Sequence, residues 1–174
     1  MDWYSRVFEL IDMRSFSNLW YWIALAALWS AASHRVLGVP WDLVHRAARN
    51  GGQFQTDLET LVRINVTRIL YIAAVSGLWL IGLASGLLTA LTILGFWYKV
   101  EFAQAVLLLA APMTLVGLLT LNTARVISET WPQGADLRRK LVRHRLTIQF
   151  IGMVSIFVTA MWGMYQNIAI SVLG

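Results

Sequence analysis

The chain has 174 residues, of which 58% are hydrophobic and only 13% are charged, and its formal net charge is +5. A soluble domain typically has about 25% charged residues, so too few charges remain here to cover a globule of this size. The composition argues against a soluble enzyme, a nucleic-acid-binding domain and a disordered chain, and it indicates an integral membrane protein. The absence of cysteine excludes disulfides, thiolate metal ligands and cysteine nucleophiles.

The N-terminal segment, residues 1–18, is predicted to be an interfacial amphipathic helix. Between residues 2 and 14 the apolar side chains recur at helical spacing on one face, and the charged side chains take the other face. Such a helix lies in the membrane interface or docks on another protein, and its acidic residues slightly favour the protein. The same acidic residues argue against a cleaved signal peptide.

Four stretches without charged residues are long enough, or nearly so, to cross a bilayer. A hydrocarbon core about 30 Å thick requires roughly 20 residues of helix. None of these stretches alternates apolar and polar residues as a barrel strand does, so all four are predicted to be helices. The fold class is therefore an all-α polytopic membrane protein with one four-helix domain. The predicted spans are about residues 18–34, 69–98, 102–124 and 146–172.

The connection at residues 34–68 is too long to be a bare loop. Pro40 suits the first turn of a helix over residues 41–49, and the Asn-Gly-Gly sequence at 50–52 breaks that helix. Residues 56–59 have capping-box spacing and are predicted to start a helix that continues into the second span. We therefore expect a helical hairpin on the cytoplasmic surface.

The distribution of basic residues predicts the orientation. Eleven of the 14 basic residues lie in the connection between the first and second spans and the connection between the third and fourth, whereas the hairpin between the second and third holds only Lys99. Four spans place both basic connections on the same side, and basic loops stay cytoplasmic. Both termini and the Lys99 hairpin are therefore expected on the periplasmic side of a bacterial inner membrane.

Tryptophans near the span ends support these boundaries, because indole rings prefer the headgroup region. Two others, Trp29 and Trp79, fall deeper in the spans and are predicted to pack against other helices. The predicted interfacial anchors are Trp20, Trp22, Trp97 and Trp162.

A basic cluster follows a predicted turn at residues 131–134 (Trp-Pro-Gln-Gly). Anionic lipid headgroups account for such a cluster, at about 1 kcal/mol per basic residue near the surface. Nucleic acid is not expected, because the cluster abuts a membrane span and lacks base-stacking aromatic residues. The predicted anionic-lipid-binding residues are Arg138, Arg139, Lys140, Arg143 and Arg145.

Small residues line one face of the second predicted span and one face of the fourth. The second span contains a GxxxG sequence at residues 82–86. Small residues let helices approach closely, so both faces mark helix contacts, and packing of the second helix on the fourth is the plainest arrangement. The predicted packing residues are Gly77, Gly82, Gly86, Ser155, Thr159 and Gly163.

No catalytic motif occurs, and no ionisable residue lies in the core of a span. This argues against proton pumps, ion-coupled transporters and intramembrane proteases. The chain is predicted not to be an enzyme and to hold no metal and no cofactor. An open alternative involves His34 and His144, which approach each other if the first and fourth helices pack together. The two histidines could then form a metal or quinone site, or an enzyme centre at the headgroup boundary.

Uncharged polar residues inside the spans are expected to form interhelical hydrogen bonds. Gln149, about one turn inside the cytoplasmic end of the fourth span, is the candidate for substrate contact, although a structural role is favoured. A transporter or channel requires Gln104, Asn122 and Gln149 to converge on one cavity.

Three segments resemble a small family of alphaproteobacterial inner-membrane proteins described as components of the SufBCD complex. They are residues 9–23 (ELIDMRSFSNLWYWI), 33–44 (SHRVLGVPWDLV) and 143–167 (RHRLTIQFIGMVSIFVTAMWGMYQN). The resemblance rests on general similarity over most of the chain and not on a catalytic motif. It implies a link to iron–sulfur cluster assembly, although a chain without cysteine has none of the usual cluster ligands.

Together these patterns predict a non-catalytic accessory or assembly subunit of a larger inner-membrane protein complex. It is expected to act through helix–helix and lipid contacts, with membrane lipids and other integral membrane proteins as partners. The alternative is a small oligomeric transporter or channel.

Overall fold

The computed structural model describes Phe16 and residues 18–173, with side chains described as far as Ile168. The predicted amphipathic helix at 1–18 lies almost wholly outside the described residues. The described chain is helical apart from one short β-hairpin and its connecting turns, which confirms the predicted fold class at the level of secondary structure. Its elements are α2 (Leu19–His34), β1 (Arg35–Val36), β2 (Val39–Pro40), α3 (Trp41–Asn50), α4 (Gly52–Thr92), the π-helical turn η2 (Ile93–Trp97), α5 (Glu101–Thr130) and α6 (Gly134–Leu173).

Three helices are long and apolar enough to cross a membrane: α4 continued by η2, then α5, then α6. They contain the second, third and fourth predicted spans. The first predicted span is also a helix, and it starts at Leu19, where the side chain of Asn18 accepts a hydrogen bond from the backbone N–H of Trp20 at 3.0 Å. With 16 residues, however, α2 is about 24 Å long, which is shorter than the other three.

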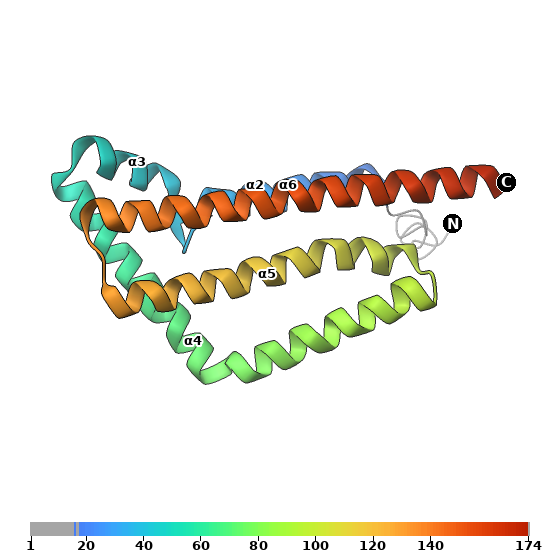
Figure 1. The fold of residues 1–174 in the computed structure, drawn as a ribbon, viewed down its shortest axis with the longest axis horizontal. Coiled ribbons are helices and arrows are strands. Elements are labelled where there is room, and N and C mark those ends of the chain that lie inside the picture. Colours follow the sequence, from blue (N-terminus) through green and yellow to red (C-terminus); the bar gives the residue numbers. More distant parts are fainter. Residues whose placement is uncertain (1–15, 17, 174) are drawn as a thin grey trace, which may run out of the picture.

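The helices are arranged around α5. Figure 1 shows α2 and α6 side by side, with α5 next to them and α4 on the far side of α5. The first part of α4 lies beside α3 at one end of the molecule. Its second part, after a bend, leads to η2 at the other end. Among the described helices, none lies against the side of this second part of α4 that faces away from α5.

The helix break at residues 50–52 is confirmed, but the predicted start of the next helix is wrong. We expected that start at residues 56–59, whereas α4 begins at Gly52. Gly51 and Gly52 both have left-handed backbone angles, with φ of +58° and +51°, so the chain reverses within two residues and the helix resumes at once. Thr56 therefore lies inside the helix and donates a hydrogen bond to the carbonyl of Gly52 at 3.3 Å.

The β-hairpin between α2 and α3 was not predicted. Its turn consists of Leu37 and Gly38, with φ of +51° and +75°, as a type I′ turn requires. A leucine in the left-handed region costs about 1–2 kcal/mol. Leu37 is only 2% exposed, and burial of a leucine side chain contributes about 2 kcal/mol, which offsets that cost.

The buried apolar side chains form two separate cores. The larger core, which we call the basic-end core, lies where the β-hairpin, α3, the first part of α4, the end of α5 and the start of α6 meet. The smaller core lies between α2, α5 and α6 and consists of Leu25, Trp29, Val116 and Ile148. The basic-end core consists of Val36, Leu37, Val39, Val44, Ala47, Leu58, Val62, Val66, Ala124, Ile127, Leu137 and Leu141.

Candidate functional site

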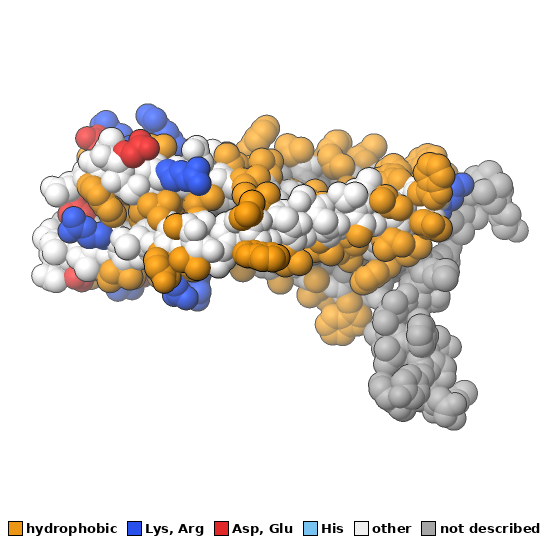
Figure 2. Space-filling view, turned by 90° about the horizontal axis from the view of Figure 1, so that it is seen from below, with side chains coloured by type: hydrophobic (Ala, Val, Ile, Leu, Met, Phe, Trp, Pro, Cys, Tyr) orange, Lys and Arg blue, Asp and Glu red, His pale blue; other side chains and the backbone are white. Residues whose placement is uncertain are grey.

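The predicted basic cluster lies on the first three turns of α6, which form one continuous helix with the fourth predicted span. Figure 2 shows Lys and Arg side chains gathered mostly at the end of the molecule that holds α3 and the start of α6, with apolar side chains over much of the remaining face. This separation of charge from apolar surface is typical of a membrane protein whose basic end faces water and headgroups.

Two members of the cluster are held by neighbouring elements. The Nζ of Lys140 donates to the hydroxyl of Thr130 at 2.9 Å. The Nε of Arg145 donates to the carbonyl of Ser33 at the end of α2, at 3.2 Å, and its guanidinium lies 4.2 Å from the centre of the Trp41 ring. Such a cation–π contact helps to fix α3 against α6.

The other three members, Arg138, Arg139 and Arg143, line one cavity of about 440 Å³ between α3 and α6. None of the residues that line it is acidic. Lys140 and Arg145 therefore join helices without lining this cavity, whereas Arg138, which also bonds to Gln55 of α4, lines it together with the exposed Arg139 and Arg143. The remaining lining residues are Trp41, Val44, His45 and Ala48 of α3 and Ala135 and Val142 of α6.

The two histidines of the open alternative are not turned toward each other. His144 is 5% exposed, and its ring lies between two threonines of α5, with Nε2 3.2 Å from the Thr120 hydroxyl and Nδ1 3.1 Å from the Thr123 hydroxyl. His34 is exposed at the end of α2. Within the described residues, no group of three or more His, Asp or Glu side chains is placed to hold a metal ion.

Gln104 is the centre of a buried polar cluster that joins η2, α5 and α6. Its Nε2 donates to the carbonyl of Gly95 at 2.7 Å. Its Oε1 accepts from the indole N–H of Trp162 at 3.0 Å and from Nε2 of Gln166 at 2.7 Å. Gln104 is 4% exposed and makes the interhelical hydrogen bonds that were expected of the uncharged polar residues inside the spans.

The polar residues named for a transport path do not meet in one place. Asn122 is exposed and Gln149 is half-buried. Gln104 and Asn122 belong to the same straight run of α5, and 18 residues of helix separate them by about 27 Å. None of the three lines any of the four main cavities of the described chain.

The small face of α6 is a helix contact, as predicted, but its partner is α2 and not α4. A Cβ atom placed on Gly152 meets the ring of Trp29 at 2.8 Å, and one on Gly163 meets Phe16 at 3.3 Å. Because α2 already covers this face, α4 has no access to it. The predicted residues on this face, Ser155, Thr159 and Gly163, are all buried.

The small face of α4 packs against nothing in the described chain, so the predicted packing of the second helix on the fourth is wrong. A Cβ atom placed on Gly77, Gly82 or Gly86 has no other atom within 4 Å. In the most apolar 18-residue stretch of this span the buried share is 0%, whereas in the corresponding stretches of α5 and α6 it is 22% and 28%. Trp79, predicted to pack, is 82% exposed, whereas Trp29 is 6% exposed and packs as predicted.

Gly82 and Gly86 are one turn apart and exposed, whereas Gly77 lies on nearly the opposite side of the helix, among the half-buried residues Ala73, Ser76, Ala84 and Leu88. The prediction that Gly77 shares a face with Gly82 and Gly86 is therefore wrong. We call the side of α4 that carries Gly82 and Gly86 the open α4 face.

The four predicted tryptophan anchors fall into two pairs. Trp20 and Trp97 are 67% and 82% exposed, as an interfacial ring should be. Trp22 and Trp162 instead donate their indole N–H groups within the protein, Trp22 to the carbonyl of Phe16 at 3.0 Å. Trp162 therefore also links α6 to α5, whereas the bond of Trp22 holds the segment that precedes α2.

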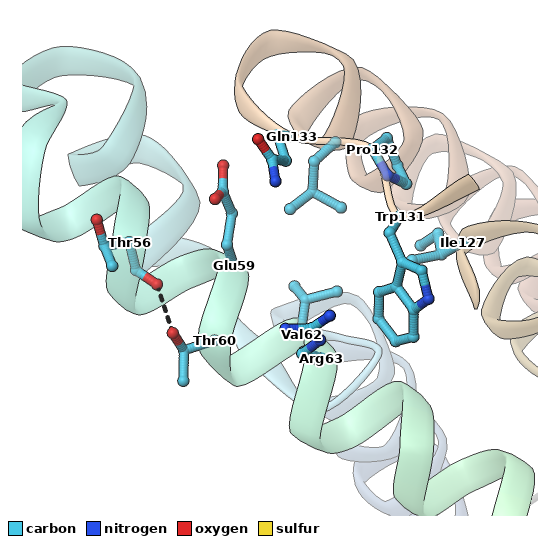
Figure 3. Close-up of a pocket in the computed structure, with 10 residues that line it drawn as sticks. Thr56, Glu59, Thr60, Val62, Arg63, Ile127, Trp131, Pro132 and Gln133 are labelled. Carbon is cyan, nitrogen blue, oxygen red and sulfur yellow. Dashed lines mark hydrogen bonds between the residues drawn. The ribbon is translucent and has the colours of Figure 1, made fainter. Parts of the chain in front are cut away.

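A second cavity, of about 250 Å³, lies where the first part of α4 meets the turn between α5 and α6. Figure 3 shows Glu59 and Arg63 on the α4 side of this cavity and Trp131 on the other. The Glu59 carboxylate accepts from the backbone N–H of Gly134 at 2.8 Å, and the Arg63 guanidinium lies 5.1 Å from the centre of the Trp131 ring. Glu59 thus ties α4 to the start of α6, and Arg63 ties α4 to the turn between α5 and α6.

No family model matches this chain, and neither a curated protein nor a solved structure shows significant similarity to it. The family resemblance drawn from residues 9–23, 33–44 and 143–167 therefore stays an expectation. The function has to be argued from the open α4 face and from the basic end of α6.

Proposed function

We propose that the protein is a non-catalytic accessory or assembly subunit of a larger inner-membrane protein complex, and that it binds another integral membrane protein through the open α4 face. The observation that carries the proposal is the pair of glycines one turn apart on this face, Gly82 and Gly86, against which no part of the described chain packs. Lipid tails cover any apolar helix, so exposure alone does not require a protein partner. A pair of glycines in GxxxG spacing does favour one, because a second helix can approach the backbone there and gain close packing that lipid chains do not provide.

The other small face of this chain supports the same conclusion. On α6 the contacts of Gly152 and Gly163 come from side chains of α2 and its N-terminal flank, Trp29 and Phe16. The chain therefore uses rows of small residues to receive large side chains from a neighbouring helix. The partner suited to the open α4 face is an apolar transmembrane helix with large side chains at matching intervals.

The membrane placement is part of the proposal. We infer that α2 crosses the membrane together with α4, α5 and α6, with the basic connections in the cytoplasm and both termini in the periplasm. Support comes from the packing of the apolar α2 along α6, itself long enough to span (Figure 1). The bond from Arg145 to the Ser33 carbonyl further brings the end of α2 to the level where the basic cluster begins.

The partner surface is tested by filling it. The double variant Gly82→Leu/Gly86→Leu is expected to reduce the recovery of co-purifying membrane proteins at least tenfold, because about 1.4 kcal/mol of lost contact already lowers binding tenfold. The stability of the isolated chain should stay unchanged, since open space surrounds both positions. The measurement is affinity purification in mild detergent followed by quantitative mass spectrometry.

Gly117→Leu is the matched control, because Gly117 is an exposed helical glycine of α5 with no atom near its Cβ position. Equal recovery of every membrane protein by the double variant and the control would contradict the proposal. So would migration of the wild-type protein at monomer mass alone on native gels.

The crossing number is tested by cysteine labelling, for which a chain without cysteine is a ready background. In intact cells a membrane-impermeant maleimide should label Lys99→Cys and Asn18→Cys, and it should label Gln133→Cys only after permeabilisation. These positions lie in the turn after η2, directly before α2, and in the turn between α5 and α6. If Asn18→Cys is labelled only after permeabilisation, α2 does not cross and the chain has three spans.

A further inference from the structure

We propose that the cavity between α3 and α6 binds the phosphate of an anionic phosphate ester such as a phospholipid headgroup. Three guanidinium groups, from Arg138, Arg139 and Arg143, line this cavity, and His45 of α3 lines it from the other helix. The proposal concerns a different surface from the open α4 face and does not depend on a protein partner.

The arginines suit phosphate because of their geometry as well as their charge. Arg139 and Arg143 are four residues apart and share one face of α6, and Arg138 borders the same cavity from the adjoining side of the helix. A guanidinium presents a planar fork of N–H donors that matches two phosphate oxygens at once. Several forks around one space can therefore surround a tetrahedral anion from more than one direction.

Little within the described chain neutralises these three charges. Arg138 donates to the amide oxygen of Gln55, a neutral partner that leaves its charge uncompensated. Arg139 lies 3.5 Å from Asp136, but both side chains are about three-quarters exposed, and such surface pairs contribute little. On α3, Asp42 is engaged by Arg46 at 2.8 Å. The cavity therefore keeps a net positive charge that an anionic ligand balances.

The remaining walls explain why a phosphate ester fits better than a bare ion. They are formed by the side chains of Val44, Ala48, Ala135 and Val142 and by the ring of Trp41. Apolar walls lower the local dielectric and strengthen the attraction between an anion and the guanidinium groups. They also accommodate the glycerol and first methylene groups of a lipid. Trp41 holds the His45 ring in an edge-to-face contact, with centroids 5.3 Å apart, so the histidine is positioned at the cavity.

The depth of the cavity agrees with a headgroup, given the membrane placement proposed above. Arg139 and Val142 lie about 5–9 Å beyond Arg145 along α6, at 1.5 Å per residue. Arg145 contacts the end of the apolar α2. The headgroup layer on each side of a bilayer is about 5–7 Å thick, so a phosphate at this depth reaches the cavity from the membrane plane.

The test is a titration of the purified full-length protein in a neutral detergent with phosphatidylglycerol, read by native mass spectrometry. Detergent removes the general attraction of a charged membrane surface, so only a defined site retains a lipid. The wild-type protein is expected to retain one phosphatidylglycerol molecule. Arg139→Gln/Arg143→Gln should bind about thirtyfold more weakly, since each basic residue contributes a factor of about five near an anionic group.

Arg49→Gln/Arg125→Gln is the matched control, because it removes the same charge from exposed positions that do not line the cavity. The control should bind like the wild type. Equal weakening of both double variants, or no lipid bound to the wild type at low micromolar concentration, overturns the proposal. His45→Ala provides a second variant on the other helix and is expected to weaken phosphatidylglycerol binding severalfold at unchanged Tm. Wild-type affinity in both His45→Ala and Arg139→Gln/Arg143→Gln also overturns the proposal.

A second titration with glycerol 1-phosphate separates the two sources of the phosphate ester. Weak binding of this soluble compound beside tight binding of phosphatidylglycerol supports the site as a membrane-lipid site. Equally tight binding of both also supports the phosphate site and identifies its ligand as a soluble ester.

Discussion

Gly152→Leu is expected to lower the free energy of unfolding by about 2–3 kcal/mol, because the new side chain occupies space that the Trp29 ring already fills. Even a methyl group at this position meets a ring carbon of Trp29 at 2.8 Å, and leucine extends further. Trp29 is 6% exposed and packs with Leu25, Val116 and Ile148, so its ring has no free space to enter. In the Gly152→Leu variant, the contact between α2 and α6 is therefore strained.

The measurement is thermal unfolding of the purified protein in detergent, where we expect Tm to fall by roughly 5–10 °C. Gly82→Leu is the matched control, because it makes the same substitution in open space and should leave Tm within about 1 °C. A double-mutant cycle with Trp29→Leu isolates the clash, since Gly152→Leu should cost much less when the indole is absent. If Gly152→Leu costs the same with and without Trp29, the contact is not the cause.

Gln104→Leu is the second substitution with a large expected effect, about 2 kcal/mol of lost stability. It leaves the carbonyl of Gly95, the indole N–H of Trp162 and the amide of Gln166 without the partner that they share. Buried unpaired groups cost about 1–3 kcal/mol each, and interhelical hydrogen bonds in membranes lie toward the low end of such values. The three losses together exceed the gain from a more apolar side chain.

Gln149→Leu is the control for this substitution, because Gln149 is half-buried and its side chain makes no hydrogen bond within the described residues. We expect its Tm to stay equal to or above that of the wild type. Thermal unfolding in detergent measures both variants. Equal Tm values for Gln104→Leu and Gln149→Leu would show that the cluster around Gln104 contributes nothing to stability.

The sequence was sufficient to predict where the helices lie and where most of the breaks between them occur. The Asn-Gly-Gly break at 50–52 and the turn at 131–134 both lie where they were predicted, and the first helix starts within a residue of its predicted boundary. These signals are local, since a cap or a glycine acts on the few residues beside it. The start of α4 was misplaced because the glycines already allow a helix to begin, and the capping-box spacing at 56–59 was not needed.

The side of each helix that packs could not be deduced from composition. Trp29 and Trp79 sit at similar depths of apolar spans, yet one is buried and the other is 82% exposed. In water a buried residue is recognised by its apolar character, whereas in lipid the exposed face is equally apolar, so that distinction is lost. The small face of α4 and that of α6 therefore looked alike, although α2 covers only the second.

The cavity between α3 and α6 was predicted only in part, because it also depends on how the helices pack. A run of basic residues predicts a basic surface, but it does not say which side chains meet. The separation of Arg138, Arg139 and Arg143 from Lys140 and Arg145 depends on where α3 and the end of α2 lie. His45 and Trp41 reach the cavity from a helix more than 85 residues earlier in the chain, a contact that no local pattern reveals.

The two separate cores imply that the ends of this molecule differ in their thermodynamics. The basic-end core is closed by segments that lie almost wholly outside the predicted spans, so its cohesion comes from expulsion of water. Such cohesion carries a large heat-capacity change and fades on cooling. In the membrane placement proposed above, the contact of α2 with α6 lies among hydrocarbon, where dispersion and close fit replace that driving force. Cold should therefore loosen the basic end while the contact between α2 and α6 persists.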